Sequence, residues 1–267
     1  MRQAEWTVTA RRAGRTILCI VASALLGGCT PPSPGDPGSD GSSAPEPSGA
    51  ELLLERSIRF HDPNGHWGKR PLRLDWNGSG ADGEERLAFE ISIAADGAGI
   101  ELSGRYAEST LEYATDGVEV RVRVDGSSEL DEETRKRLAL GREDGLFWRN
   151  YFRFLAGLPM NLRDPGTRVD PDPVTTTFMD REVLSIRLSF DPDVGGDLWY
   201  FYFEPGNAEL VGCRFYHDEA ANDGEYIVME GLVEHAGLRL PRHRRWHVNS
   251  DDRFLGADTL AHLAVAD

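Results

Sequence analysis

Two histidines and an aspartate fall within a stretch of seven residues, His61-Asp62-Pro63-Asn64-Gly65-His66-Trp67. Imidazole and carboxylate groups this close together can bind a metal ion or act as acid and base in a hydrolase. However, the chain shows no second cluster with metal-ligand spacing, and the Pro and Asn-Gly residues are typical of turns. We therefore favour a helix that ends at His61, an Asx turn at Asp62 and a packed Trp67. We expect no catalytic residue, no metal and no cofactor, and an envelope enzyme using His61, Asp62 and His66 remains the alternative.

Two other groups of charged residues invite the same question. His217-Asp218-Glu219 joins a histidine to acids beside a polar turn, which favours a solvated loop over a second catalytic group. Alternate members of a basic run would share one side of a strand, where they could meet an anionic headgroup or an acidic partner. A solvated strand face paired with nearby acids is the simpler interpretation. The basic run consists of Arg239, Arg242, His243, Arg244, Arg245 and His247.

The first residues of the chain have the pattern of an export signal. Four arginines precede a short apolar core at 17–26, which ends in Gly27-Gly28-Cys29. This core is too short to span a bilayer as a stable helix. The sequence Leu25-Leu26-Gly27-Gly28-Cys29 resembles the lipobox of bacterial lipoproteins, in which the cysteine receives a diacylglyceryl group before cleavage. The resemblance implies a signal peptide at 1–28 and a lipidated Cys29 that binds the membrane through palmitate-type acyl chains.

Composition divides the rest of the chain into a tether and one domain. Residues 29–49 hold the lipidated cysteine and a Pro/Gly/Ser-rich linker that cannot bury enough surface to fold, and the domain spans 50–267. Removing residues 1–28 takes away a net charge of +3, so the net charge of −16 becomes −19. Such acidity disfavours nucleic acid as a partner. Cys213 is then the remaining cysteine besides Cys29, and we expect a buried apolar residue rather than a catalytic thiol.

The domain begins with a helix and continues mainly as antiparallel strands. Ser48 and Glu51 have the spacing of a capping box before an amphipathic helix. Apolar residues then alternate with polar ones, as in Val118–Val124, and Asp-Gly pairs at 96–97 and 116–117 favour hairpin turns. A charged helical segment covers 131–140. Strands resume near 174, and the aromatic stretch 199–203 predicts a strand covered on both faces. We expect an α+β fold with about ten or eleven antiparallel strands and two or three helices.

A helix reaching from about Asp144 to Ala156 is aromatic around much of its surface. That is more apolar surface than a helix exposed to solvent needs. It is either simply buried against the sheet or also lines a pocket for a hydrophobic ligand. The residues that we predict to line such a pocket are Phe147, Trp148, Tyr151, Phe154, Leu155, Leu158, Trp199 and Phe201.

Several short motifs together resemble a group of bacterial proteins of unknown function. They are 54–63 followed by Gly65-His66-Trp67, then 157–160 with 164–166, 238–241 with Arg245-Trp246, and 254–258. That group looks related to the LolA/LolB outer-membrane lipoprotein-sorting superfamily. The resemblance implies a strongly curved antiparallel sheet, an unclosed barrel whose helices lie on the concave face. It also implies an apolar cavity between sheet and helices for an acyl chain, and no catalytic residues. The protruding hydrophobic loop of the LolB-type receptor matches no stretch of this chain.

The predicted function is a lipid-anchored protein facing the periplasm that binds a hydrophobic small molecule or acyl chain. Residue 30 is Thr. In the Gram-negative lipoproteins that this sequence resembles, an Asp after the lipidated cysteine marks retention in the inner membrane. The resemblance therefore implies transfer to the outer membrane. One alternative is the enzyme with the His61 cluster. The other is a structural module without a cavity, in which the outer sheet face or an edge strand binds another envelope protein.

Overall fold

The computed structural model describes residues 46–192 and 194–266. The predicted signal peptide at 1–28, Cys29 and residues 30–45 of the predicted linker lie outside these ranges. The first described element is helix α1 (Gly49–His61), and its start confirms the capping box. The Ser48 hydroxyl accepts a bond from the Glu51 amide at 3.2 Å, and the Ser48 amide donates to the Glu51 carboxylate at 2.7 Å. Two otherwise unpaired amides are thereby satisfied at the helix start.

Within the described ranges, thirteen strands form one sheet in which every pairing is antiparallel. Their order is β5-β4-β3-β2-β1-β13-β12-β11-β10-β9-β8-β6, and β7 also pairs with β8. The strands of the first half are β1 (Leu72–Gly80), β2 (Glu85–Ile93), β3 (Ile100–Tyr106), β4 (Ser109–Thr115) and β5 (Val120–Val124). Those of the second half are β6 (Thr167–Val169), β7 (Val174–Phe178), β8 (Arg181–Phe190), β9 (Leu198–Phe203), β10 (Leu210–Tyr216), β11 (Glu225–His235), β12 (Leu238–Val248) and β13 (Phe254–Val265).

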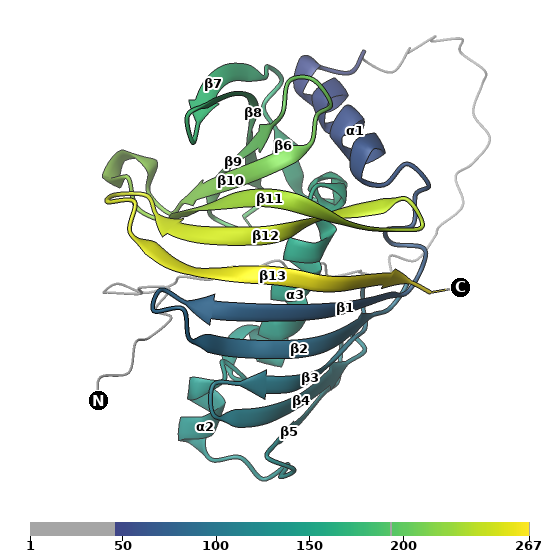
Figure 1. Ribbon diagram of the computed structural model, residues 1–267, viewed down its shortest axis with the longest axis vertical. Coiled ribbons are helices and arrows are strands. Elements are labelled where there is room, and N and C mark those ends of the chain that lie inside the picture. The colour runs from purple at the N-terminus through teal and green to yellow at the C-terminus, as the bar shows by residue number, and fades with distance from the viewer. Residues whose placement is uncertain (1–45, 193, 267) are drawn as a thin grey trace, which may run out of the picture.

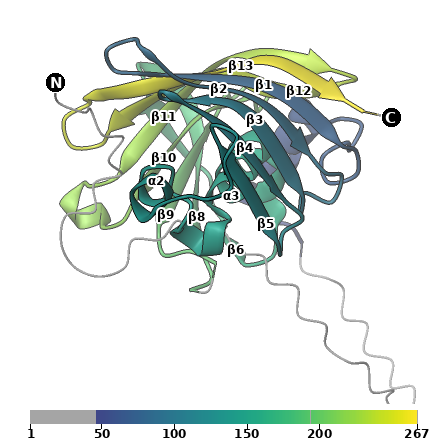
Figure 2. The same cartoon turned by 90° about the horizontal axis from the view of Figure 1, so that it is seen from below.

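The sheet curves strongly and does not close, because β5 and β6 end the strand order without pairing with each other. Figure 2 shows it as an arch with helix α3 beneath, and Figure 1 shows the same helix behind the strands. The predicted fold class, an α+β unclosed barrel with helices on its concave face, is therefore confirmed. The sequence predicted about ten or eleven strands, and the difference includes the three-residue β6, which is too short to show a period.

The chain segment between β5 and β6 contains the remaining described helices, apart from a short turn at Glu219–Ala221. Asp131 accepts a bond from the Thr134 amide and so begins the first of them. The aromatic helix begins at Phe147 rather than at the predicted Asp144, because a separate 3-10 turn precedes it. The four elements are α2 (Glu132–Arg137), η1 (Arg142–Gly145), α3 (Phe147–Gly157) and η2 (Met160–Arg163).

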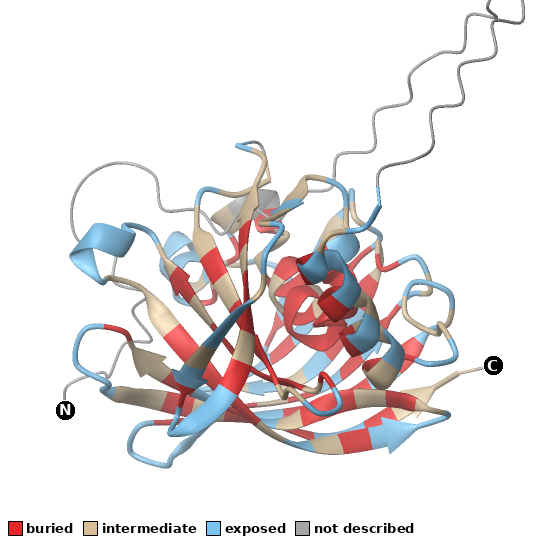
Figure 3. Ribbon diagram, turned by 90° about the horizontal axis from the view of Figure 1, so that it is seen from above, coloured by how far each residue is buried: buried red, intermediate tan, exposed pale blue. Residues whose placement is uncertain are grey.

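Alternation along the strands sends apolar side chains to the concave face. In β4, buried residues alternate with exposed or half-buried ones, and Figure 3 shows the same alternation in other strands. One continuous apolar cluster then joins both halves of the sheet to α1 and α3. Burial of this surface is the main favourable term in folding, at roughly 25 cal/mol per Å². Among the described residues, no helix has the length and apolar character needed to cross a membrane.

Candidate functional site

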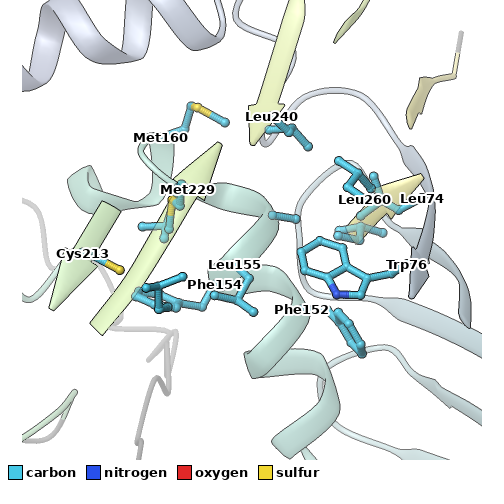
Figure 4. Close-up of a cluster of buried hydrophobic side chains, with 14 of the residues drawn as sticks. Leu74, Trp76, Phe152, Phe154, Leu155, Met160, Cys213, Met229, Leu240 and Leu260 are labelled. Carbon is cyan, nitrogen blue, oxygen red and sulfur yellow. The ribbon is translucent and has the colours of Figure 1, made fainter. Parts of the chain in front are cut away.

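Helix α3 occupies the concave face and contacts both halves of the sheet through its aromatic side chains. Toward the first half, the ring of Phe152 lies edge-on to Trp76 of β1 at 5.5 Å and to Phe89 of β2 at 6.0 Å. Toward the second half, Phe154 lies 5.1 Å from Trp199 of β9. Figure 4 shows Phe152 beside Trp76, and Phe154 on the side of Cys213 and Met229. Edge-on aromatic pairs of this kind contribute about 0.5–1.5 kcal/mol beyond their burial.

All eight residues predicted to line a ligand pocket belong to the apolar cluster between the sheet and α3 or pack against it. Phe147 and Tyr151 are half-buried, and the other six are buried. The structure therefore brings the predicted residues together, and their role in ligand binding stays a prediction. The six buried residues are Trp148, Phe154, Leu155, Leu158, Trp199 and Phe201.

A hollow of about 1160 Å³ lies elsewhere and has a different character. Its lining comes from β1–β5 and residues 128–145. None of the eight predicted residues lines this hollow. The charged side chains of its lining are Arg73, Asp75, Glu90, Glu101, Glu112, Arg121, Arg123 and Arg135.

A small set of polar bonds holds α3 in place. Near its N-terminus, the indole of Trp148 donates to the Leu138 carbonyl at 2.9 Å. In the middle, the Tyr151 hydroxyl donates to the Asp258 carboxylate of β13 at 3.4 Å. Near its C-terminus, Arg244 of β12 donates to the Leu155 carbonyl at 3.1 Å. These bonds satisfy groups that burial would otherwise leave unpaired.

Arg244 is the principal buried charge of this region, with 0 % of its surface exposed. Its guanidinium stacks 4.3 Å above the ring of Trp76 and also donates to the Pro241 carbonyl at 2.9 Å. Burial lowers the pKa of Arg244 to about 10, although the nearby Asp258 opposes that shift. The side chain is therefore still a cation at neutral pH.

Asp258 is the acidic group nearest to this centre and is also buried. Its carboxylate accepts a bond from the Trp246 indole at 2.8 Å, besides the bond from Tyr151. Burial raises the pKa of Asp258, and the hydrogen bond from Trp246 opposes this rise. Burial likewise raises the pKa of the Tyr151 hydroxyl, which keeps it protonated as a donor.

The cluster at 61–66 is tied to the backbone rather than assembled for chemistry. Buried His61 joins the Arg239 carbonyl at 2.8 Å through Nδ1, and its Nε2 accepts the Leu210 amide at 3.0 Å. The carboxylate of Asp62 accepts the amides of His66 and Trp67, which is the predicted Asx turn. Nε2 of His66 lies 3.0 Å from the Ala236 carbonyl. Because these groups hold α1 against β12, their contacts favour the turn over a catalytic centre.

The other sequence candidates separate in space. His217 pairs with Asp197 at 2.7 Å on a partly exposed loop, and this contact raises the pKa of His217. Cys213 is buried, and burial raises the pKa of its thiol, which suppresses the reactive thiolate. Within the described ranges, no group of three or more His, Cys, Asp or Glu residues could hold a metal ion.

The basic run divides between the two faces of β12. Arg239 and Arg245 pair with Glu234 and Glu230 outside, as a solvated face would. Arg244 instead points inward, which the interpretation of a solvated face missed. A usable signal was present: Leu238, Leu240, Arg244 and Trp246 are all even-numbered, so they share one face of the strand.

The arrangement defines a curved antiparallel sheet whose concave face is covered by an aromatic helix. A family model described as a family of unknown function, DUF6503, matches residues 42–262, so the chain belongs to this family. A search of curated proteins gave no match.

Three solved structures are similar to the chain in outline. A LolA superfamily protein from Nitrosomonas europaea has 11 % identity and a TM-score of 0.49, over 82 % of this chain and 94 % of that one. An outer membrane lipoprotein-sorting protein domain from Vibrio parahaemolyticus has 9 % identity and a TM-score of 0.47, over 81 % and 93 %. A DUF1329 family protein from Desulfovibrio piger has 8 % identity and a TM-score of 0.40, over 82 % and 93 %. The names of the first two agree with the superfamily that the sequence resembles, and at these scores none of the three says anything about ligand or activity.

Proposed function

We propose that this protein is a lipid-anchored envelope protein that binds an acyl chain or another hydrophobic ligand between its sheet and helix α3. The observation that carries the proposal is the way in which α3 covers the concave face of the sheet. The centre of the apolar concave face of the sheet is covered by the eleven-residue helix α3, whose aromatic side chains fill the space an acyl chain would take, and α1 packs beside it. Binding then exchanges one apolar filling for another, and each ligand methylene removed from water contributes roughly 0.8 kcal/mol.

The ligand enters when α3 moves away from the sheet. The helix backbone has its closest neighbours in η1 and η2, and it meets the strands through side chains. Its displacement breaks the bonds from Arg244 and to Asp258 and Leu138, and also those from Arg149 to the carbonyls of the β2–β3 turn at 97–98, but it disrupts no strand pairing. The predicted residues Phe147, Trp148, Tyr151, Phe154, Leu155, Leu158, Trp199 and Phe201 would then contact the ligand.

A direct test uses the full chain with Cys29→Ser, so that the protein's own lipid is not the ligand. Titration with the fluorescent C18 polyene cis-parinaric acid should give saturable binding at one equivalent. Native extraction followed by lipid mass spectrometry should find a co-purifying lipid. A folded protein, shown by near-UV circular dichroism, that gives neither signal would exclude the proposal.

A pair of leucine variants tests the site. Leu155→Ala removes a buried part of the covering helix and leaves space for ligand atoms, so we expect tighter binding of the probe. Leu52→Ala, on the exposed side of α1, should leave the affinity unchanged. Equal affinities in both variants would place the ligand elsewhere on the molecule.

The membrane anchor is a separate part of the proposal. We expect the mature chain to begin at a lipidated Cys29 and to reside on the periplasmic face of the outer membrane, given Thr30. Metabolic labelling with palmitate should mark the wild-type chain and not Cys29→Ser. Membrane fractionation should then place the labelled chain with outer-membrane markers.

A further inference from the structure

A charged hydrogen-bond donor at the centre of the concave face has no acceptor. Nε of Arg244 is fully buried and lacks a partner. The guanidinium stacks on the Trp76 ring at 4.3 Å, and the Trp76 indole itself bonds to the Asp258 carboxylate. An unpaired buried donor is destabilising, and more so where it carries charge. The free Nε of Arg244 therefore points to an acceptor that binds there.

The positive charge of Arg244 is also uncompensated by direct contact. Among the described residues, no carboxylate oxygen lies within ion-pair distance of its guanidinium. Two neutral carbonyls, of Pro241 and Leu155, take its other donors. The Leu155 carbonyl lies near the C-terminus of α3, where the helix dipole offers only a partial negative charge.

Asp258 offsets part of this charge from a distance but makes no ion pair with Arg244. It faces Arg244 across the β12–β13 pair, and its carboxylate accepts the Trp246 indole, the Trp76 indole and the Tyr151 hydroxyl. A buried cation without a directly bound anion is unstable relative to a buried ion pair. A negatively charged oxygen at Nε of Arg244 would remove that penalty and also satisfy the free donor.

We propose that Arg244, stacked on the ring of Trp76, binds an oxyanion at the head of the ligand, which makes the ligand an acyl amphiphile with a carboxylate or phosphate rather than a neutral lipid. This assignment rests on the proposed function. The oxyanion replaces the Leu155 carbonyl at Arg244 as α3 moves away. The apolar side chains around Trp76, which include Leu74, Phe152 and Leu260, surround the first methylenes (Figure 4).

The test compares three ligands that share a sixteen-carbon chain: hexadecanoate, hexadecyl phosphate and hexadecanol. Each displaces the neutral dye Nile red from the full chain with Cys29→Ser. We expect at least one of the two anions to bind about tenfold tighter than the alcohol, as a charge-assisted bond implies. Comparison of the two anions distinguishes a fatty acid from a phospholipid-like headgroup.

Variants then locate the preference. Arg244→Met should bring the ratio of anion to alcohol affinity close to 1. The ratio is the readout because easier opening of α3, through loss of the bond from Arg244 to Leu155, changes the affinity for all three ligands alike. Arg245→Met is the matched control, since Arg245 is the adjacent, exposed arginine paired with Glu230 at 3.4 Å, and its ratio should match wild type. Trp76→Phe keeps an aromatic ring under the guanidinium and removes the indole donor beside it, so it should lower the ratio in part, and it decides the matter if Arg244→Met fails to fold.

Two outcomes would overturn this inference and leave the proposed function intact: equal binding of anions and alcohol by the wild type, or an unchanged ratio in both Arg244→Met and Trp76→Phe. Failure of all three ligands to displace Nile red would instead overturn the proposed function, and the headgroup assignment with it.

Discussion

The two halves of the sheet differ in how many of their faces are covered. In the half formed by β1–β5, exposed outer residues alternate with buried inner ones, and one face meets solvent. In the half containing β9–β11, consecutive residues are buried, such as Phe201, Tyr202 and Phe203. There the hairpin of β7 folds over the outer face and stacks Phe178 on Tyr202 at 4.2 Å. The apolar side chains therefore form two clusters, a large inner one on the concave face and a small outer one around Phe178. We expect the two clusters to contribute differently to the free energy of unfolding.

The largest expected effect comes from the inner cluster. Phe152→Ala removes a ring with 0 % exposure that touches Trp76 and Phe89, and the closed surroundings cannot collapse to fill the space. We expect a loss of about 3–5 kcal/mol in the free energy of unfolding. Urea denaturation followed by circular dichroism measures it, and a loss below about 1 kcal/mol would show that the interior repacks freely.

A smaller effect is expected from the outer cluster. Phe178 packs in a group completed by Val183, Tyr202, Val211, Tyr226 and Val228, and its short hairpin can shift after truncation. Phe178→Ala should cost roughly 2 kcal/mol, less than Phe152→Ala. The same denaturation experiment compares the two variants directly. Equal losses would contradict the distinction between a main and a subsidiary core.

A different kind of effect, a pH dependence of stability, is expected in the doubly covered half. Burial raises the pKa of Glu225, at the start of β11, from its usual 4.5 to about 7. The folded state then holds the proton more tightly, so the stability from this group is fully present below pH 4.5 and is lost as pH rises through 7. Glu225→Gln should flatten the fall in stability over that window, as measured by urea denaturation at several pH values.

The control for this variant comes from the half with one exposed face. Glu112 is an exposed residue of β4, and Glu112→Gln should change the free energy of unfolding by less than about 0.5 kcal/mol. The pH dependence of Glu112→Gln should match that of the wild type. If Glu225→Gln also matches the wild type, burial of Glu225 has no influence on stability.

Local signals in the sequence predicted much of the fold. Ser48 and Glu51 specified the start of α1, Asp62 specified the turn, and alternation specified strands such as β2 and β4. Each of these depends on residues close together in the chain. The aromatic stretch 199–203 predicted cover on both faces, but the cover itself comes from Phe178 in a strand with an exposed Val174. Such contacts join residues that are far apart in the sequence, so no local sequence pattern predicts them.

The candidate site was predicted less completely than the fold. The spacing of aromatic residues identified the helix that covers the concave face, because that helix is unusually apolar for its length. Arg244 was instead grouped with its charged neighbours, since a single arginine does not reveal that a strand face is buried. Its environment depends on Trp76 and Leu155, which lie far away in sequence.

The missing pairing between β5 and β6 has a mechanical consequence. A fully closed barrel has a fixed circumference, because widening it would break main-chain bonds around the whole ring. Here the chain leaves one free edge at β5, passes through α3 and returns at the other free edge, β6. The sheet can therefore widen between β5 and β6 without breaking any strand pairing. Under the proposed function, this would let ligands of different width fit inside it.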